Sequence, residues 1–304
     1  MTRVAALDCG TNSLRLLVAD VSGDTLVDVT REMQVVRLGQ GVDRTGELAP
    51  EALERTRVAL VDFAATCERL GAERTRMVAT SATRDARNRD DFVQMVVDAL
   101  GVPPEVVSGD EEAALSFDGA TRGLDPAEGP FLVVDIGGGS TELVLGTTGV
   151  EAARSVDVGC VRLTERHLDD DPPTAAQVAA AEADIDAGIA LVRETVPVER
   201  ARLPVGLAGS VTTVAAHALD LPAYQSGRIH LARLPARDLV QACTELLQMP
   251  RADRAALPYM HPGRVDVIGA GALLLRTLVD RLGWSELLVS EADILDGIAW
   301  SAAR

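Results

Sequence analysis

The chain has 304 residues, of which 47% are hydrophobic, and it carries a formal net charge of −17. This length suits about two domains, and the hydrophobic content supports buried cores, which excludes a largely disordered chain. The negative charge argues against duplex nucleic acid as a main partner, because binding to a phosphate backbone needs a basic face.

The residue types narrow the possible chemistry further. All 29 basic residues are arginine, so a GxxxxGK[ST] P-loop and Schiff-base chemistry are excluded. A phosphate site must then use arginine, backbone N–H groups, hydroxyls or a metal ion. The four cysteines form no CxxC pair and predict neither disulfides nor a zinc site.

Charges in the first twenty residues argue against a signal peptide. No uncharged apolar run reaches the ~18–20 residues of a membrane span, so we expect a soluble cytoplasmic protein without a membrane partner.

The first half of the chain predicts alternating strands and helices. We expect strands at 4–9, 13–20 and 25–32, a helix at 50–70 between Pro50 and Gly71, a strand at 76–80, a helix at 89–100, a strand at 105–108 and a helix from about 110. The apolar runs at 76–80, 131–134 and 203–208 do not alternate with polar residues. This indicates strands that are buried on both faces.

The second half repeats this order, with an insertion. We expect strands at 131–136, 141–146 and 151–158, a helix at 174–195, a strand at 203–208, a helix at 210–219, an inserted helical stretch at 236–257, a helix at 264–282, a strand at 285–290 and a helix at 292–302. Each half therefore reads βββαβαβα. The breaker-rich segment 122–130 predicts domains at 1–124 and 125–304, with the last helix a candidate to pack back on the first domain. The apolar helix at 264–282 is expected in the core, with a homodimer interface as the alternative.

Two glycine loops reveal an internal duplication. The stretch DCGTNSLR at 8–15 superposes on DIGGGSTE at 135–142, and Val-Arg-Leu at 36–38 is echoed at 161–163. Gly10 then matches Gly137, whereas Arg15 matches Glu142. Glycine without a Cβ lets a phosphate approach several backbone N–H groups. The expected phosphate-binding residues of the two loops are Gly10, Thr11, Asn12, Ser13, Gly137, Gly138, Gly139, Ser140 and Thr141. The alternative is a pair of ordinary hairpin turns.

Three further segments could carry chemistry. Arg84 follows a strand and could bind a phosphate with its guanidinium, or lie on a solvated face beside a helix cap. Ser108 and Glu111 fit a capping box, which leaves Glu112 as a candidate general base or a surface acid favourable at a helix N-terminus. The turn at Gly209 and Ser210 opens a helix and suits an anion or a simple cap. The acids that end equivalent strands, Asp8 and Asp135, could hold a hard cation. The four histidines show no metal-ligand spacing.

The whole chain resembles a known family. The duplicated halves with Asp-led glycine loops resemble the actin, sugar-kinase and Hsp70 superfamily, which implies an α/β fold of two actin-like (ribonuclease H-like) domains and an interdomain cleft. Within it, DCGTNSLR, SGDEEA at 108–113 and DIGGGSTE together resemble the exopolyphosphatase and guanosine pentaphosphate phosphatase family, in its short two-domain form.

The resemblance implies a role for each matching residue. Glu112 matches the catalytic carboxylate that activates water, and Glu142 matches a second essential acid. Asp135 matches an acid near magnesium, so the expected ligands of Mg²⁺ or Mn²⁺ are Asp135, Glu142 and Asp8. The loop at 10–13 and Arg84 match one phosphate site, and 137–141 match the other. Residues 209–210 lie where superfamily relatives contact nucleotide, although the fuller nucleotide-binding pattern is missing.

The sequence therefore predicts a metal-dependent exopolyphosphatase. It would hydrolyse the terminal phosphoanhydride of inorganic polyphosphate, with short chains preferred because the net charge repels a long polyanion. Two alternatives stay open. The first is a phosphohydrolase that converts guanosine pentaphosphate to tetraphosphate, and the second is a sensor that binds polyphosphate, nucleotide or alarmone without turnover. An ATP-dependent kinase is the least favoured, because Glu112 is available to activate water.

Overall fold

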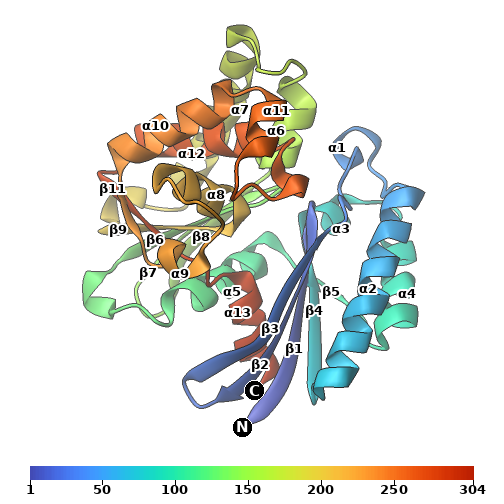
Figure 1. Ribbon diagram of the computed structural model, residues 1–304. Helices are drawn as coiled ribbons and strands as arrows, with labels where there is room; N and C mark the ends of the chain where they lie inside the picture. Colours follow the sequence, from blue (N-terminus) through green and yellow to red (C-terminus); the bar gives the residue numbers. More distant parts are fainter. The chain divides into compact units, whose positions relative to one another are not determined.

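The computed structural model describes residues 1–304 and divides into two compact units (Figure 1). Residues 1–119 together with 294–304 form the first unit, and residues 120–293 form the second. Each unit is built on its own sheet. No helix combines the length and the apolar character that crossing a membrane requires.

The sheet of the first unit has five strands in the order β3-β2-β1-β4-β5. Its strands are β1 (Thr2–Cys9), β2 (Ser13–Ser22), β3 (Thr25–Val35), β4 (Arg74–Ala79) and β5 (Glu105–Val106). The first three strands run antiparallel, while β4 and β5 continue parallel to β1. The parallel strands end at the same edge as the turn between β1 and β2, which is where the first glycine loop lies.

Helices cover both faces of this sheet (Figure 1). They are α1 (Val42–Thr45), α2 (Pro50–Leu70), α3 (Ser81–Asp85), α4 (Arg89–Leu100), α13 (Ile294–Ala302) and α5 (Gly109–Thr121), whose last residues belong to the second unit. Along β1, Ala5 and Leu7 pack with α2 and α4, whereas Val4 and Ala6 pack with α13. Alternate residues of a strand point to opposite faces, so both sets are buried and the strand reads as a continuous apolar run.

The sheet of the second unit repeats the same strand order. Its strands are β6 (Phe131–Ile136), β7 (Thr141–Gly146), β8 (Val150–Val156), β9 (Leu203–Leu207), β10 (Arg233–Pro235) and β11 (Glu286–Val289), in the order β10-β11-β9-β6-β7-β8. Without the short β10, both sheets place their third, second, first, fourth and fifth strands side by side. The predicted α/β class with duplicated actin-like domains is confirmed.

The second unit is covered by α6 (Cys160–His167), α7 (Ala175–Arg193), α8 (Ala208–Ala218), α9 (Ser226–Ile229), α10 (Ala236–Gln248), α11 (Arg251–Ala256) and α12 (Ile268–Leu282), with 3₁₀ turns at Pro126–Glu128, Val198–Arg200 and Pro262–Arg264. Helix α12 is buried along most of its length within the core cluster of this unit. This burial agrees with the expected core role of the apolar segment rather than with a dimer interface.

The helix ends follow the sequence signals, whereas several short elements do not. Pro50 opens α2, and Gly71 ends it with a left-handed φ of 69°. No element was predicted at α1, α3, α6, α9 or β10, because these segments are too short to show helical or strand periodicity. Two of them, α3 and α6, contribute directly to the candidate site.

Burial should make the cysteines unreactive in the folded protein. All four are free and buried, and burial raises the pKa of the thiols of Cys67 and Cys243 to about 11 and about 12. At pH 8 these thiols remain protonated, and thiolate is the reactive form. We expect less than one thiol per chain to react with Ellman's reagent in the native protein, and four after denaturation. Rapid reaction of two or more native thiols would contradict this burial.

Candidate active site

The two glycine loops make the same turn. Gly10 N donates to Ser13 O, and Gly137 N donates to Ser140 O, both at 3.0 Å. A Cβ on Gly137 would lie 2.9 Å from the Ser140 carbonyl oxygen, so only glycine fits this turn without a shift of the backbone. The shared hydrogen bond supports the alignment of Asp8 with Asp135 that the sequence suggested.

The carbonyl groups of the three glycines in the second loop point toward α6. Gly137 O accepts from Cys160 N at 3.0 Å, Gly138 O accepts from Val161 N at 2.8 Å, and Gly139 O accepts from Arg162 Nε at 2.8 Å. In a trans peptide unit the C=O and the following N–H point in opposite directions. The N–H groups of residues 138, 139 and 140 therefore point away from α6, and none of them donates to another group of the chain. Successive N–H groups of this kind are suited to bind an anion.

Two carboxylates lie opposite each other beside this loop. Asp135 on β6 pairs in register with Glu142 on β7, and both are buried. Directly opposite residues of an antiparallel pair have Cβ atoms about 4.5–5.5 Å apart, and like charges there disfavour each other. Ser155 Oγ donates to Glu142 Oε1 at 2.7 Å and fixes that carboxylate. The arrangement favours a cation between the two acids.

The equivalent pair in the first unit joins an acid to an arginine instead of to a second acid. Asp8 pairs in register with Arg15, and Arg15 Nε and Nη2 both donate to Asp8 Oδ2, at 3.0 and 2.7 Å. The charge of Asp8 is thus offset by an arginine of its own sheet. This placement supports Asp8 less well as a metal ligand than Asp135 or Glu142.

Glu112 and Arg84 are brought together within the first unit. Arg84 on α3 donates through Nη1 to Glu112 Oε2 at 3.0 Å and to Val107 O at 3.1 Å. Glu112 is only 8% exposed, so its carboxylate lies in a restricted setting rather than on a solvated face. Beside Arg84, the buried hydroxyls of Ser81 and Thr83 have no hydrogen-bond partner in the chain. Buried polar groups are normally paired, so these two donors suit a bound phosphate.

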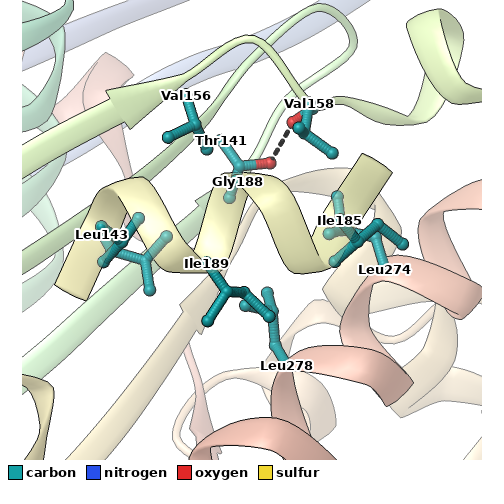
Figure 2. A pocket seen from close by; sticks show the side chains of 10 residues that line it. Thr141, Leu143, Val156, Val158, Ile185, Gly188, Ile189, Leu274 and Leu278 are labelled. Carbon is teal, nitrogen blue, oxygen red and sulfur yellow. Dashed lines mark hydrogen bonds between the residues drawn. The ribbon is translucent and has the colours of Figure 1, made fainter. Parts of the chain in front are cut away.

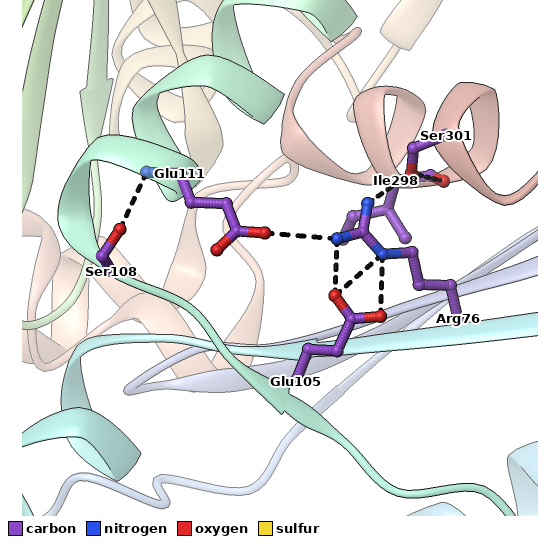
Figure 3. Close-up of polar contacts among 6 residues, drawn as sticks. All are labelled: Arg76, Glu105, Ser108, Glu111, Ile298 and Ser301. Carbon is purple, nitrogen blue, oxygen red and sulfur yellow. Dashed lines mark hydrogen bonds and ion pairs between the residues drawn. The ribbon is translucent and has the colours of Figure 1, made fainter.

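The neighbouring acid, Glu111, has a different role. Ser108 Oγ accepts from Glu111 N at 3.2 Å, which forms one half of the predicted capping box. The reciprocal half is absent, because the Glu111 carboxylate instead accepts from Arg76 Nη2 at 3.4 Å (Figure 3). Arg76 also pairs with Glu105, at 2.6 Å. Glu111 is therefore part of a structural ion network, and only Glu112 of the acidic pair faces Arg84.

Thr141 faces away from the expected phosphate. Its hydroxyl donates to Val158 O at 2.6 Å, and its side chain lines a small apolar cavity of about 10 Å³ beneath β7 (Figure 2). Alternation along the strand places Thr141 and Glu142 on opposite faces. The expected donation from the Thr141 hydroxyl to a phosphate does not match this placement, whereas Ser140 remains in the loop.

The first loop is held in a similar way to the second. Thr11 O accepts from Gly39 N at 2.8 Å, and Asn12 O accepts from Val36 N and Arg37 N at 3.1 and 2.8 Å. The echoed Val-Arg-Leu segments thus lie directly behind both loops. Thr11 is buried, and Ser13 begins β2.

Gly209 and Ser210 follow Ala208, the first residue of α8. Ala208 has a left-handed φ of 65°, and a Cβ on Gly209 would lie 2.4 Å from the guanidinium of Arg264. Ser210 hydrogen-bonds the Cys160 thiol, whose pKa is nevertheless raised by burial. Because Cys160 N donates to Gly137 O, Ser210 is linked to the second loop through one residue.

Arg264 is a candidate site residue that the sequence analysis missed. It covers Gly209 and donates through Nη1 to Thr213 Oγ1 at 3.2 Å. It stands in a 3₁₀ turn, where no motif singles it out. The absence of lysine could have drawn attention to it, since each arginine was a candidate anion ligand.

The acids beside the second loop can be the ligands of a hard metal ion. Within the chain, no three or more His, Cys, Asp or Glu side chains come together as a metal cluster. The facing carboxylates of Asp135 and Glu142 are hard oxygen donors, and Mg²⁺ typically uses one or two carboxylates together with substrate phosphates and water. The residues therefore fit Mg²⁺ or Mn²⁺ better than a metal that needs a full protein cage.

Comparisons with known proteins agree with this geometry. The family model described as the Ppx/GppA phosphatase family matches residues 17–303. The chain is 54% identical over 316 aligned positions to Exopolyphosphatase 2 of Mycobacterium tuberculosis, covering 100% of this chain and 99% of that protein. The crystal structure of an exopolyphosphatase-like protein has a TM-score of 0.95 and 42% identity, with 98% of each chain covered. The Aquifex aeolicus Ppx/GppA family member has a TM-score of 0.83 and 28% identity, covering 99% of this chain and 97% of that one. This chain belongs to the Ppx/GppA phosphatase family.

Proposed function

We propose that this protein is an exopolyphosphatase, which hydrolyses the terminal phosphoanhydride of inorganic polyphosphate and releases orthophosphate. The observation that carries the proposal is the second glycine loop, whose three outward N–H groups lie next to the facing acids Asp135 and Glu142. Such a loop suits a chain of phosphates, and the acids suit the cation that accompanies it. The family membership and the relative named exopolyphosphatase support the same reaction.

The side chains have distinct roles in the proposed reaction. The outward N–H groups of the second loop bind phosphate oxygens, and Arg84 with the hydroxyls of Ser81 and Thr83 binds a phosphate in the first unit. Glu112 acts as the general base: it accepts a proton from water as the water oxygen attacks the terminal phosphorus. The bond from that phosphorus to the bridging oxygen breaks, and the remaining chain leaves one phosphate shorter. Asp135 and Glu142 would hold Mg²⁺ or Mn²⁺, which offsets phosphate charge when bound. That both loops face one cleft stays a prediction.

A second candidate substrate is guanosine pentaphosphate. It is favoured by the surroundings of Gly209, where Arg264 lies against the glycine. Nearby, the Tyr224 hydroxyl donates to Glu291 Oε1 at 2.7 Å and hydrogen-bonds Thr212 Oγ1 of α8 at 2.8 Å. Tyr224 is 39% exposed, so its ring is available to a nucleoside. A sensor that binds without turnover is less well supported, because Glu112 and Glu142 are both present.

The test is phosphate release from tripolyphosphate, longer polyphosphates, guanosine pentaphosphate and ATP, with and without Mg²⁺. We expect release from polyphosphate that stops when EDTA is added, and faster turnover of short chains because of the net charge of −17. Faster release from guanosine pentaphosphate would select the second candidate. Tight binding by calorimetry without turnover of any phosphoanhydride would select the sensor. A homodimer and a cytoplasmic location remain predictions. Light scattering would test the homodimer.

A further inference from the structure

We propose that Gly159 and Arg162 are positioning residues for the second phosphate loop, residues 137–140. They hold the loop carbonyls from behind, so that the loop N–H groups keep facing a phosphate. The inference rests on the proposed function, because it concerns the same site. Neither residue belongs to the glycine motif, and both come from the region of α6, which the sequence did not predict as a helix.

The first N–H groups of α6 form hydrogen bonds with the loop carbonyls. The first N–H groups of a helix have no partner within the helix, and Gly159 provides no side-chain cap for α6. The carbonyls of Gly137 and Gly138 take that place, because they accept from the N–H groups of residues 160, 161 and 162 at 2.8–3.2 Å. The backbone of α6 therefore fixes the first two peptide units of the loop.

The third peptide unit depends on a side chain. Gly139 O accepts from Arg162 Nε at 2.8 Å, and no other group of the chain donates to it. This bond fixes the peptide between Gly139 and Ser140, and with it the direction of the Ser140 N–H. Glycine has few steric limits, so without this bond the peptide is free to rotate. Arg162 thus controls whether the loop presents two or three aligned N–H groups.

Gly159 lets the loop and the helix approach closely. A Cβ at this position would lie 2.5 Å from Gly138 C and O and 2.7 Å from Gly139 C. These are backbone atoms, which cannot move aside as the end of a flexible side chain can. Gly159 itself has φ −148° and ψ 166°, an extended conformation that alanine adopts without strain. Replacement by alanine would therefore act through contact with the loop alone.

The loop of the first unit also has a glycine behind it, although this glycine lies against a side chain of the loop rather than its backbone. Gly39 N donates to Thr11 O at 2.8 Å, and a Cβ on Gly39 would lie 2.3 Å from Thr11 Cγ2. A glycine and neighbouring backbone amides thus stand behind each loop. In the second loop, which has three consecutive glycines, an arginine side chain also donates to the third carbonyl.

The test compares four variants by steady-state kinetics with tripolyphosphate and Mg²⁺. R162M is expected to raise KM about tenfold with less than threefold change in kcat, because one hydrogen bond to a charged phosphate is lost. R162K should recover part of the loss, since lysine can still donate to Gly139 O. G159A should raise KM to a similar extent without any change of charge. The control is R166M on the same helix, where the exposed Arg166 pairs with the half-buried Asp184 at 2.9 Å, and its KM should equal the wild-type value.

Two results would overturn the inference. One is a KM within twofold of wild type for both R162M and G159A, in variants whose thermal denaturation shows them folded. The other combines a wild-type KM in G159A with a wild-type KM in R162K that is lost at high salt. That result would mean that the charge of Arg162 contacts the phosphate directly. If the wild type releases no phosphate, the proposed function fails separately. Calorimetry with tripolyphosphate then tests the inference, and R162M is expected to bind tripolyphosphate with a higher Kd than the wild type.

Discussion

Replacement of Glu112 by glutamine is expected to lower kcat for phosphate release about 10²–10⁴-fold, the range typical of a lost general base. KM should change little. Glutamine keeps an oxygen that can accept from Arg84 Nη1, which lies 3.0 Å from Glu112 Oε2, so the local structure persists while the proton acceptor is lost. The measurement is initial-rate kinetics with tripolyphosphate at saturating Mg²⁺.

The adjacent acid provides a matched control for this experiment. Glu111 lies on the same helix turn, carries the same charge and pairs with Arg76 outside the proposed site. Glu111→Gln should therefore retain kcat within about twofold, since surface ion pairs contribute little. If E112Q and E111Q have equal activity, Glu112 is not the base and its contact with Arg84 is purely structural.

Replacement of Glu142 by glutamine is expected to weaken the response to Mg²⁺. Glu142 faces Asp135 across the β6–β7 pair, and two carboxylates provide more charge for a cation than one. Glutamine keeps the oxygen that accepts from Ser155, so the fold of β7 should be preserved. We expect at least a tenfold rise in the Mg²⁺ concentration that gives half-maximal activity, together with a lower kcat.

Thermal denaturation gives a second readout that does not depend on turnover. A cation that binds only the folded protein stabilises it by mass action, so Mg²⁺ should raise the Tm of the wild type. The same Mg²⁺ concentration should raise the Tm of E142Q less. The control is Glu151→Gln on β8, where the exposed acid pairs with Arg200. Equal Mg²⁺ responses of the wild type and E142Q would rule out Glu142 as a ligand.

The helix and strand order could be predicted because it depends on local signals. Buried parallel strands need continuous apolar runs, and long helices need caps such as Pro50 and Gly71. The duplicated loops could be found because close approach of backbone requires glycine, wherever it occurs. Alternation along β7 could also have shown that Thr141 and Glu142 face opposite sides, although both were expected to contact ligand.

The short elements of the site could not be predicted in the same way. Helices α3 and α6 span five and eight residues, too few to show helical periodicity, and both are fixed by contacts with distant segments. The carbonyls of the second loop cap α6, and Arg84 on α3 reaches Glu112, which is 28 residues away in the chain. The partner of Glu111 is Arg76, which no capping rule could identify.

The sequence alone thus determined the class of fold, the duplication and the residue types available to a phosphate: glycine loops, arginine and paired acids. These follow from composition and spacing, which reflect backbone geometry and burial. Only the tertiary structure decided that Glu112 faces an arginine and that the Thr141 hydroxyl bonds a carbonyl within the core. It also decided that α6 holds the loop carbonyls, so that the loop N–H groups point outward. These features depend on hydrogen bonds between segments far apart in the chain, and such bonds produce no periodic pattern in the sequence from which they could be predicted.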